Sequence, residues 1–365
     1  MIPREEPRAL VSSYARSEIT ICALGSHSAL DILDGAKDEG FRTIAVCQKG
    51  REKPYRAFRR IIDEVVLLEQ FPDIMEKQTQ DRLIKKNCIF VPHRSFAAYL
   101  GYDPIENNFR LPLFGNRGLL RIEERRGQTT QYDLLLKAGI RIPKRFKTEA
   151  EVDGPAIVKV QEAKRKLERA FFTVSSNRDY IKKSQLMMDD GIVSEEDLGK
   201  AVIEEFILGT YFNFNYFYSP LSDEVELLGI DRRLQTNLND FVSLPARQQL
   251  EMDPHIQNVE IGHTPATIRE SMLQKVLELG ERFVTTVKNE YGVGPIGPFA
   301  LQSAVTVDLD IVVFDVSPRV PGSPILATTS PYSKYYFGKV VGIGRRIAME
   351  IAKGIAEDRL SELVT

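Results

Sequence analysis

Histidine, serine and basic side chains follow the first strands expected along the chain, at the points where those strands end. GSHS, with Ser26, His27 and Ser28, follows the apolar run ITICAL; QKGR follows TIAVC; and PHRS, with Ser95, follows CIFV. Because the carboxyl ends of parallel strands meet at one edge of a sheet, we expect these loops to form one binding site. The next helix start would suit an anion such as a phosphate. The serines could instead cap that helix, and His27 could be a core histidine.

Charged and polar side chains inside apolar runs form a second group of candidates. Lys159 lies within AIVKV, whose apolar neighbours predict a strand covered by packing, so we expect an anionic partner for it. Asp315 lies within IVVFDV, and Gln302 lies on the neighbouring strand of an expected antiparallel hairpin. Magnesium prefers such oxygen ligands and is usually held by one or two protein groups and phosphates. The alternatives are an ordinary ion pair with Arg319 for Asp315, and a solvated outer face for Lys159.

The hydrophobic pattern predicts which elements hold these side chains. Over the first hundred residues, short apolar runs alternate with helical patterns, which is typical of a doubly wound parallel sheet. Helices are expected there at 29–39 and 74–86. The rest of the chain is expected to be α+β, with strands at 156–160, 171–174 and 201–208, hairpins of 211–218 with 225–230 and of 299–305 with 311–316, and helices at 128–138 and 266–291. The alternating segment YFNFNYFY predicts a half-buried strand. The fold class is therefore α/β, with a domain boundary near residue 125.

Composition excludes several classes of protein. The 365 residues are 43% hydrophobic and 27% charged with a net charge of -2, which is typical of a globular protein of two or three domains. This balance argues against a nucleic-acid partner, and no long uncharged apolar run predicts a membrane span. The charged start MIPREEPRAL is not expected to be a secretory signal. Cys22, Cys47 and Cys88 lie in apolar runs and are expected to be reduced core cysteines, which favours a cytoplasmic location.

The order of parts along the chain resembles that of the ATP-grasp superfamily, although no P-loop or dinucleotide-binding fingerprint is present. Along essentially the whole chain it resembles the archaeal formate-dependent phosphoribosyl-aminoimidazole-carboxamide ligases of purine biosynthesis. The segments that carry this resemblance are LGSHSALDILDGAKDEGF, VPHRSFAAYLG, LFGNRGLLR, IEEFILGTYF, YFYSPLSDEVELLGIDRR, GPFALQS and SPYS. It implies a pre-ATP-grasp substrate domain at 1–125, a first ATP-grasp subdomain with a lid at 126–208, and a second subdomain with the metal site at 209–365.

The resemblance also implies ligands and residue roles. ATP, Mg²⁺ (with Mn²⁺ as an alternative), formate and the aminoimidazole nucleotide are the implied ligands, an acyl phosphate is the implied intermediate in IMP biosynthesis, and a homo-oligomer is implied. The implied positions are Ser26, His27, Ser95 and His263 for the nucleotide substrate, Lys159, Glu205, Phe206, Ile207, Gln235 and Arg319 for ATP, and Gln302 and Asp315 for the metal.

Several residues depart from the pattern of the family. The glycine-rich lid GARGGRG is replaced by EAKRKLER at 162–169, which cannot supply backbone N–H groups in the same way. Gln235 and Asp315 replace glutamates, His263 replaces an asparagine, and DGGTN becomes PGSPI at 321–325. These departures predict a divergent paralogue. It would be an active ligase, a nucleotide-binding protein that has lost catalysis, or a ligase with a different acid or amine.

Overall fold

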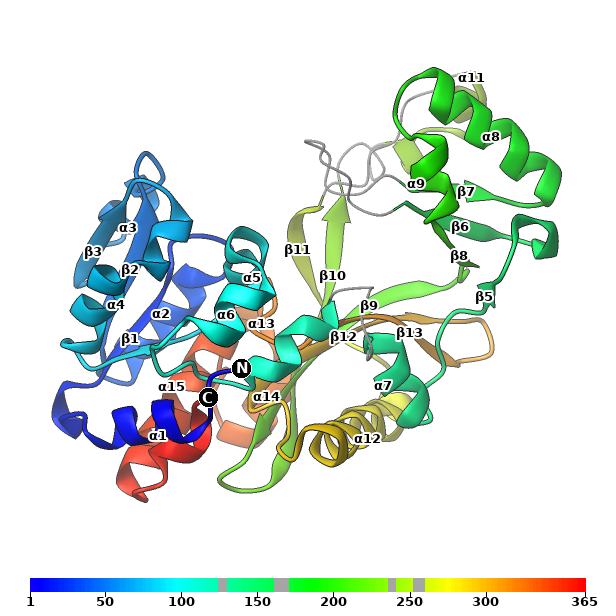
Figure 1. The fold of residues 1–365 in the computed structure, drawn as a ribbon. Helices are drawn as coiled ribbons and strands as arrows, with labels where there is room; N and C mark the ends of the chain where they lie inside the picture. Colours follow the sequence, from blue (N-terminus) through cyan, green and yellow to red (C-terminus); the bar gives the residue numbers. More distant parts are fainter. Residues whose placement is uncertain (124–129, 161–170, 236–240, 252–259) are drawn as a thin grey trace.

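The computed structural model describes residues 1–123, 130–160, 171–235, 241–251 and 260–365, which form three β-sheets and their helices (Figure 1). The N-terminal α/β part lies on the left of Figure 1, a five-stranded sheet lies at its centre, and a smaller four-stranded sheet lies at the upper right. Within these ranges, every helix is too short or too polar to span a lipid bilayer.

The N-terminal sheet is entirely parallel, as predicted. Its strand order is β3-β2-β1-β4, with β1 (Thr20–Leu24), β2 (Arg42–Gln48), β3 (Glu64–Leu68) and β4 (Cys88–Phe90). Its helices are α1 (Glu5–Ser12), α2 (Ala29–Asp38), α3 (Lys53–Ala57), α4 (Lys77–Ile84), α5 (Arg94–Leu100) and α6 (Tyr102–Asn107). Every residue of β1 is buried, because a parallel sheet covered by helices on both faces needs apolar side chains on both sides of its strands. The loops after these strands therefore lie on a rigid support.

The other two sheets form the α+β part. The smaller sheet has the order β5-β8-β6-β7, with β5 (Arg145–Phe146), β6 (Ala156–Lys159), β7 (Phe171–Val174) and β8 (Val202–Glu205), beside α8 (Asn177–Asp189) and α9 (Glu195–Gly199). The five-stranded sheet is antiparallel with the order β11-β10-β9-β12-β13, from β9 (Thr210–Ser219), β10 (Glu224–Gln235), β11 (Glu260–Ala266), β12 (Gly297–Val305) and β13 (Ile311–Ser317). The remaining helices are α7 (Gln131–Lys137), α11 (Ala246–Glu251), α12 (Leu273–Tyr291), α13 (Leu326–Thr329), α14 (Pro331–Phe337) and α15 (Ile343–Ala356).

Three expectations from the sequence are corrected by the structure. The helix expected at 266–291 begins at Leu273, because Ala266 is the last residue of strand β11 and Glu270–Met272 form the 3₁₀ helix η5. The helix expected at 74–86 is divided into the 3₁₀ helix η2 (Phe71–Met75) and α4. Strand β9 is not half-buried: Asn213 and Asn215 are 7% and 0% exposed, because β9 is the central strand and both of its faces are covered.

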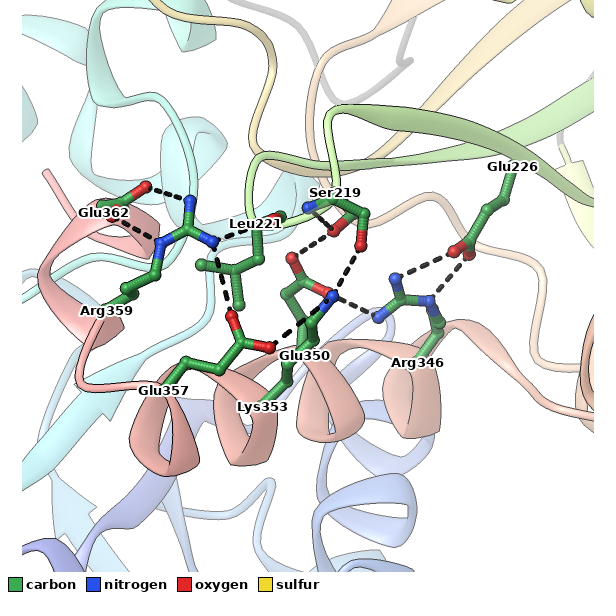
Figure 2. A network of polar contacts seen from close by, with 10 residues as sticks. Ser219, Leu221, Glu226, Arg346, Glu350, Lys353, Glu357, Arg359 and Glu362 are labelled. Atoms are coloured by element: carbon green, nitrogen blue, oxygen red, sulfur yellow. Dashed lines mark hydrogen bonds and ion pairs between the residues drawn. The ribbon is translucent and has the colours of Figure 1, made fainter.

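Helix α15 joins the N-terminal part to the five-stranded sheet. It crosses α2 so closely that a β-carbon on Gly344 would lie 1.9 Å from the carbonyl oxygen of Asp31. On its other side, the guanidinium of Arg346 donates to both carboxylate oxygens of Glu226 at 2.7 and 2.9 Å and to Glu350 at 2.8 Å (Figure 2). All three side chains of this network are buried. The two large parts of the molecule are therefore held together by a glycine contact and a buried ionic network.

Candidate functional site

The polar loops of the N-terminal sheet meet at one edge, as predicted. The hydroxyl of Ser26 accepts hydrogen bonds from the hydroxyl of Ser95 at 3.0 Å and from the guanidinium of Arg51 at 3.3 Å, so side chains from the loops after three neighbouring strands, β2, β1 and β4, are in contact. The rings of His27 and His93 stack with centroids 5.6 Å apart. His93 is 1% exposed, whereas His27 is exposed to solvent. The core-histidine alternative is therefore wrong for His27 and describes His93 instead.

Ser28 connects these loops to the closing segment of the chain. It occupies the N-cap position of α2, yet its hydroxyl makes no capping bond there and donates instead to the carbonyl oxygen of Pro321 at 2.9 Å. Gly322 follows. A β-carbon added to it would lie 3.2 Å from Nε2 of His27 and 3.6 Å from Nε2 of His263, so the two imidazoles flank this glycine closely. The structure thus brings two of the predicted substrate residues together from opposite ends of the chain.

His263 belongs to a buried polar network centred on Asp231. The Asp231 carboxylate is fully buried and accepts hydrogen bonds from Nδ1 of His263 at 2.5 Å, from the amides of Asn213 and Asn215 at 2.9 and 2.6 Å, and from the hydroxyl of Ser323 at 2.9 Å. These donors hold the pKa of Asp231 below its ordinary value, although burial alone would raise it. The carboxylate is therefore ionised.

The second ring nitrogen of His263 faces another carboxylate. Nε2 lies 2.8 Å from Glu260, which also forms a 2.8 Å ion pair with Arg233. Burial opposes the charged imidazole, but Asp231 and Glu260 together raise the pKa of His263 to about 9. His263 is thus an imidazolium at neutral pH, with both N–H groups engaged.

Sequence reasoning missed the centre of this network. Asp231 ends the apolar run LLGID, and Asn213 and Asn215 alternate with the aromatic residues of β9. Those asparagines were the available signal, because a polar face on a central strand must be satisfied internally.

Arg319 is close enough to interact electrostatically with both His27 and Asp315. Its guanidinium forms a 2.8 Å ion pair with Glu123 and donates to the carbonyl oxygen of Val320 at 3.0 Å. Burial lowers the pKa of Arg319, while the charges of Glu123 and Asp315 raise it. Arg319 is therefore a largely buried guanidinium whose charge is balanced by Glu123.

Gln302 and Asp315 are directly opposite each other on β12 and β13, as predicted. The amide of Gln131 donates to Asp315 at 3.0 Å and accepts from the backbone N–H of Val316 at 2.6 Å, which fixes the orientation of the carboxylate. An amide oxygen and a carboxylate beside each other suit Mg²⁺, which takes most of its other ligands from phosphates and water. Within the described ranges, no group of three or more His, Cys, Asp or Glu side chains is arranged to hold a metal ion by itself. A metal ion at Gln302 and Asp315 would therefore need further ligands from a bound substrate or water.

Lys159 has an anionic partner in the structure, as expected. Its ammonium group forms an ion pair with Glu204, which is 2% exposed and lies 3.6 Å from the guanidinium of Arg145. The hydroxyl of Tyr132 lies 2.9 Å from Glu204 and 3.0 Å from the carbonyl oxygen of Phe314, so it connects the small sheet to β13. The solvated-face alternative for Lys159 is therefore wrong.

The expected adenine segment continues from β8 towards β9. The carboxylate of Glu205 accepts from the backbone N–H of Lys144 at 3.1 Å, and the backbone N–H of Phe206 donates to Pro155 at 2.9 Å. Ile207 is buried against Ala304 and Val312. Gln235 ends β10 beside a bulge, opposite Glu260. The altered lid at 162–169 lies outside the described residues.

Comparison with known proteins identifies the family. Two protein families match, one described as "Domain of unknown function (DUF1297)" over residues 179–365 and one as "Protein of unknown function (DUF1246)" over residues 21–146. The chain is 41% identical, over 100% of both lengths, to the 5-formaminoimidazole-4-carboxamide-1-(beta)-D-ribofuranosyl 5'-monophosphate synthetase of Methanocaldococcus jannaschii. The chain belongs to this synthetase family.

Solved structures agree with the fold. The crystal structure of the IMP biosynthesis protein PurP from Thermococcus kodakaraensis is 30% identical and has a TM-score of 0.73, over 94% of this chain and 100% of that one. The N5-carboxyaminoimidazole synthetase of Staphylococcus aureus complexed with ADP is 12% identical with a TM-score of 0.57, over 89% of this chain and 78% of that one. At this low identity, the similarity concerns the fold only. The α/β fold class, with a parallel pre-ATP-grasp domain followed by an α+β ATP-grasp domain, is therefore confirmed.

Proposed function

We propose that the protein is an ATP- and formate-dependent ligase that converts phosphoribosyl-aminoimidazole-carboxamide to its formamido product in purine biosynthesis. The observation that carries this proposal is the joining of two groups of residues. Strand-end loops with His27 and Ser95 contact, through Ser28 and Gly322, the chain segment that also carries Asp315 and Arg319. The relatives that match over the full chain are named as synthetases of this formamido nucleotide, which gives the substrate class.

The chemistry requires activation of the acid before attack by the amine. A carboxylate resists nucleophilic attack, so transfer of a phosphoryl group from ATP gives an acyl phosphate with a good leaving group. Mg²⁺, or Mn²⁺ in its place, would be held by Gln302 and Asp315 and would neutralise the negative charge of the phosphates. Lys159 and Arg319 would supply fixed cations at the same step, since preorganised charges stabilise the charge that develops in the transition state.

Each remaining position has a proposed role in binding. Glu205, Phe206 and Ile207 would hold the adenine of ATP, with Gln235 nearby. Ser26, His27, Ser95 and His263 would hold the nucleotide substrate, whose phosphate suits the cationic surroundings. We further propose that the chain divides into a substrate domain at 1–125 and two ATP-grasp subdomains at 126–208 and 209–365. We also propose that the protein is a cytoplasmic homo-oligomer whose ligands are small molecules and not nucleic acid or membrane.

A second candidate function is favoured by His263. The family has a neutral asparagine there, whereas His263 is an imidazolium between two carboxylates. A cation in this position would suit a different acid or amine substrate. Loss of turnover with retained nucleotide binding is the remaining alternative.

The deciding experiment is a turnover assay with ATP, Mg²⁺ and the aminoimidazole nucleotide over a panel of formate, acetate, glycine and bicarbonate. We expect ADP release that needs both formate and the nucleotide, with the formamido product identified by mass. Turnover with another acid alone would support the second candidate. Absence of ADP above background with every acid, together with nucleotide binding in a calorimetric titration, would indicate lost catalysis.

A further inference from the structure

The hydrogen bonds of Ser28 determine which nitrogen of His27 carries a hydrogen. A serine hydroxyl has one proton to donate, and a carbonyl oxygen can only accept. The proton of Ser28 therefore points to the carbonyl oxygen of Pro321, 2.9 Å away. Nδ1 of His27 lies 2.6 Å from the same hydroxyl oxygen, which can now only accept. Nδ1 must therefore carry a hydrogen, and Nε2 of the neutral ring is left with a lone pair.

This Nε2 atom faces the side of the site where substrate residues converge. It is the imidazole nitrogen next to Gly322, with His263 beyond it. Both nitrogens of His263 already face carboxylates, so that imidazolium has no N–H group to give. In the part of the chain that the structure describes, no hydrogen-bond donor contacts Nε2 of His27. The lone pair is available to a ligand.

The backbone of His27 indicates that this orientation is imposed by the fold. Its φ of +46° lies in the left-handed region, which costs a non-glycine residue about 1–3 kcal/mol. The ring is supported from one side by the parallel ring of His93, whose Nε2 is bonded to the carbonyl oxygen of Leu24 at 2.9 Å. Strain of this kind collects at functional sites, where the surrounding structure holds a residue in a required position.

We propose that Nε2 of His27 accepts the proton that the substrate amine loses as its C–N bond forms, and that Ser28 is the positioning residue that holds His27 in the required tautomer. This inference rests on the proposed function. The amine nitrogen forms a bond to the acyl carbon, and the bond from that carbon to the phosphate oxygen breaks with its electron pair on phosphate. The amine proton passes to Nε2. The imidazolium then returns that proton to the released phosphate or to water, while Nδ1 keeps its own.

The charges around His27 keep it neutral before substrate binds. Although part of the His27 side chain is exposed, the protein around its ring removes some of its hydration, and the nearby cations Arg319, His263 and Arg233, with His93 beside it, act in the same direction, so the pKa of His27 lies below its ordinary value. The phosphates of the substrates would offset those cations during the reaction. His27 therefore starts the reaction as an acceptor and gains basicity as the bound anions accumulate.

The tautomer is measured directly by nuclear magnetic resonance of protein labelled with heavy nitrogen in its four histidines. We expect His27 to show a protonated Nδ1 and a pyridine-type Nε2 in the wild type, and to lose this pattern in Ser28→Ala. Ser330→Ala is a matched control, because Ser330 is also a buried N-cap serine bonded to a carbonyl oxygen, but in α14. A wild-type His27 protonated on Nε2 would overturn the proposal whatever the enzyme does.

The kinetic test uses His27→Gln, which keeps an acceptor near the position of Nε2 but cannot take the proton. We expect kcat to fall about 100-fold or more, as for loss of a general base, with the KM of the nucleotide changed less than about threefold. Formate-dependent isotope scrambling in oxygen-labelled ATP, measured without the nucleotide, should stay at the wild-type rate. A kcat within about threefold of wild type, or equal loss of scrambling, contradicts the proposed role. No scrambling and no turnover in the wild type would instead reject the proposed function.

Discussion

The charge on His263 predicts a pH dependence of folding stability that an uncharged side chain at this position would not produce. We expect His263→Asn to keep a donor to Asp231 while removing the charge and the contact with Glu260. Because the pKa of His263 is raised from 6.5 to about 9 in the folded protein, the folded state binds this proton more tightly than the unfolded state does. The stabilisation is therefore complete below pH 6.5 and is lost as the pH rises through 9.

The size of this contribution follows from the two pKa values. Their difference of about 2.5, at about 1.4 kcal/mol per pKa unit, corresponds to about 3 kcal/mol. Roughly 2 kcal/mol of this should be lost between pH 7 and pH 9. The imidazole is only 12% exposed, so solvent screening should leave most of it intact.

The assay is urea unfolding of the wild type and His263→Asn at several pH values from 6 to 10 and constant ionic strength. The difference between the two free energies of unfolding cancels other titrating groups, such as the buried carboxyl of Asp31, whose pKa is raised to about 7 by burial. We expect this difference to be largest near pH 6 and to fall steadily towards pH 10. A difference that does not change with pH would refute the charged state of His263.

Three further predictions concern the contacts of helix α15 and the proposed metal ligand Asp315. Arg346→Met should lower the free energy of unfolding by about 3–5 kcal/mol in urea titrations, because it leaves two buried carboxylates without their cation. Arg359→Met, which removes the half-exposed arginine that is also labelled in Figure 2, should cost much less. Gly344→Ala should lower the melting temperature, because its methyl group would overlap the backbone of α2 by an amount that costs about 1–3 kcal/mol or more, whereas Gly199→Ala, with open space around it, should not. Asp315→Asn should abolish Mg²⁺-dependent ADP release without changing the melting temperature, and unchanged release would reject the metal assignment.

The sequence by itself determined the elements whose partners are close along the chain. The parallel sheet follows from apolar runs alternating with helices, and the pairing of Gln302 with Asp315 follows from a short turn between two adjacent strands. The convergence of Ser26 and Ser95 also follows, since the ends of parallel strands share one edge.

Only the tertiary structure decided the contacts between distant segments. Ser28 donates a hydrogen bond to Pro321, which lies 293 positions away in the sequence. Asp231 accepts hydrogen bonds from side chains of β9, β11 and the segment after β13. No periodicity encodes these pairs, because hydrophobic patterning specifies which face of an element is buried but not which polar group will lie opposite it. The same reason explains why the alternating pattern of β9 predicted a half-buried strand. A central strand covered on both faces must satisfy its polar side chains within the protein, and the fold supplies the partner.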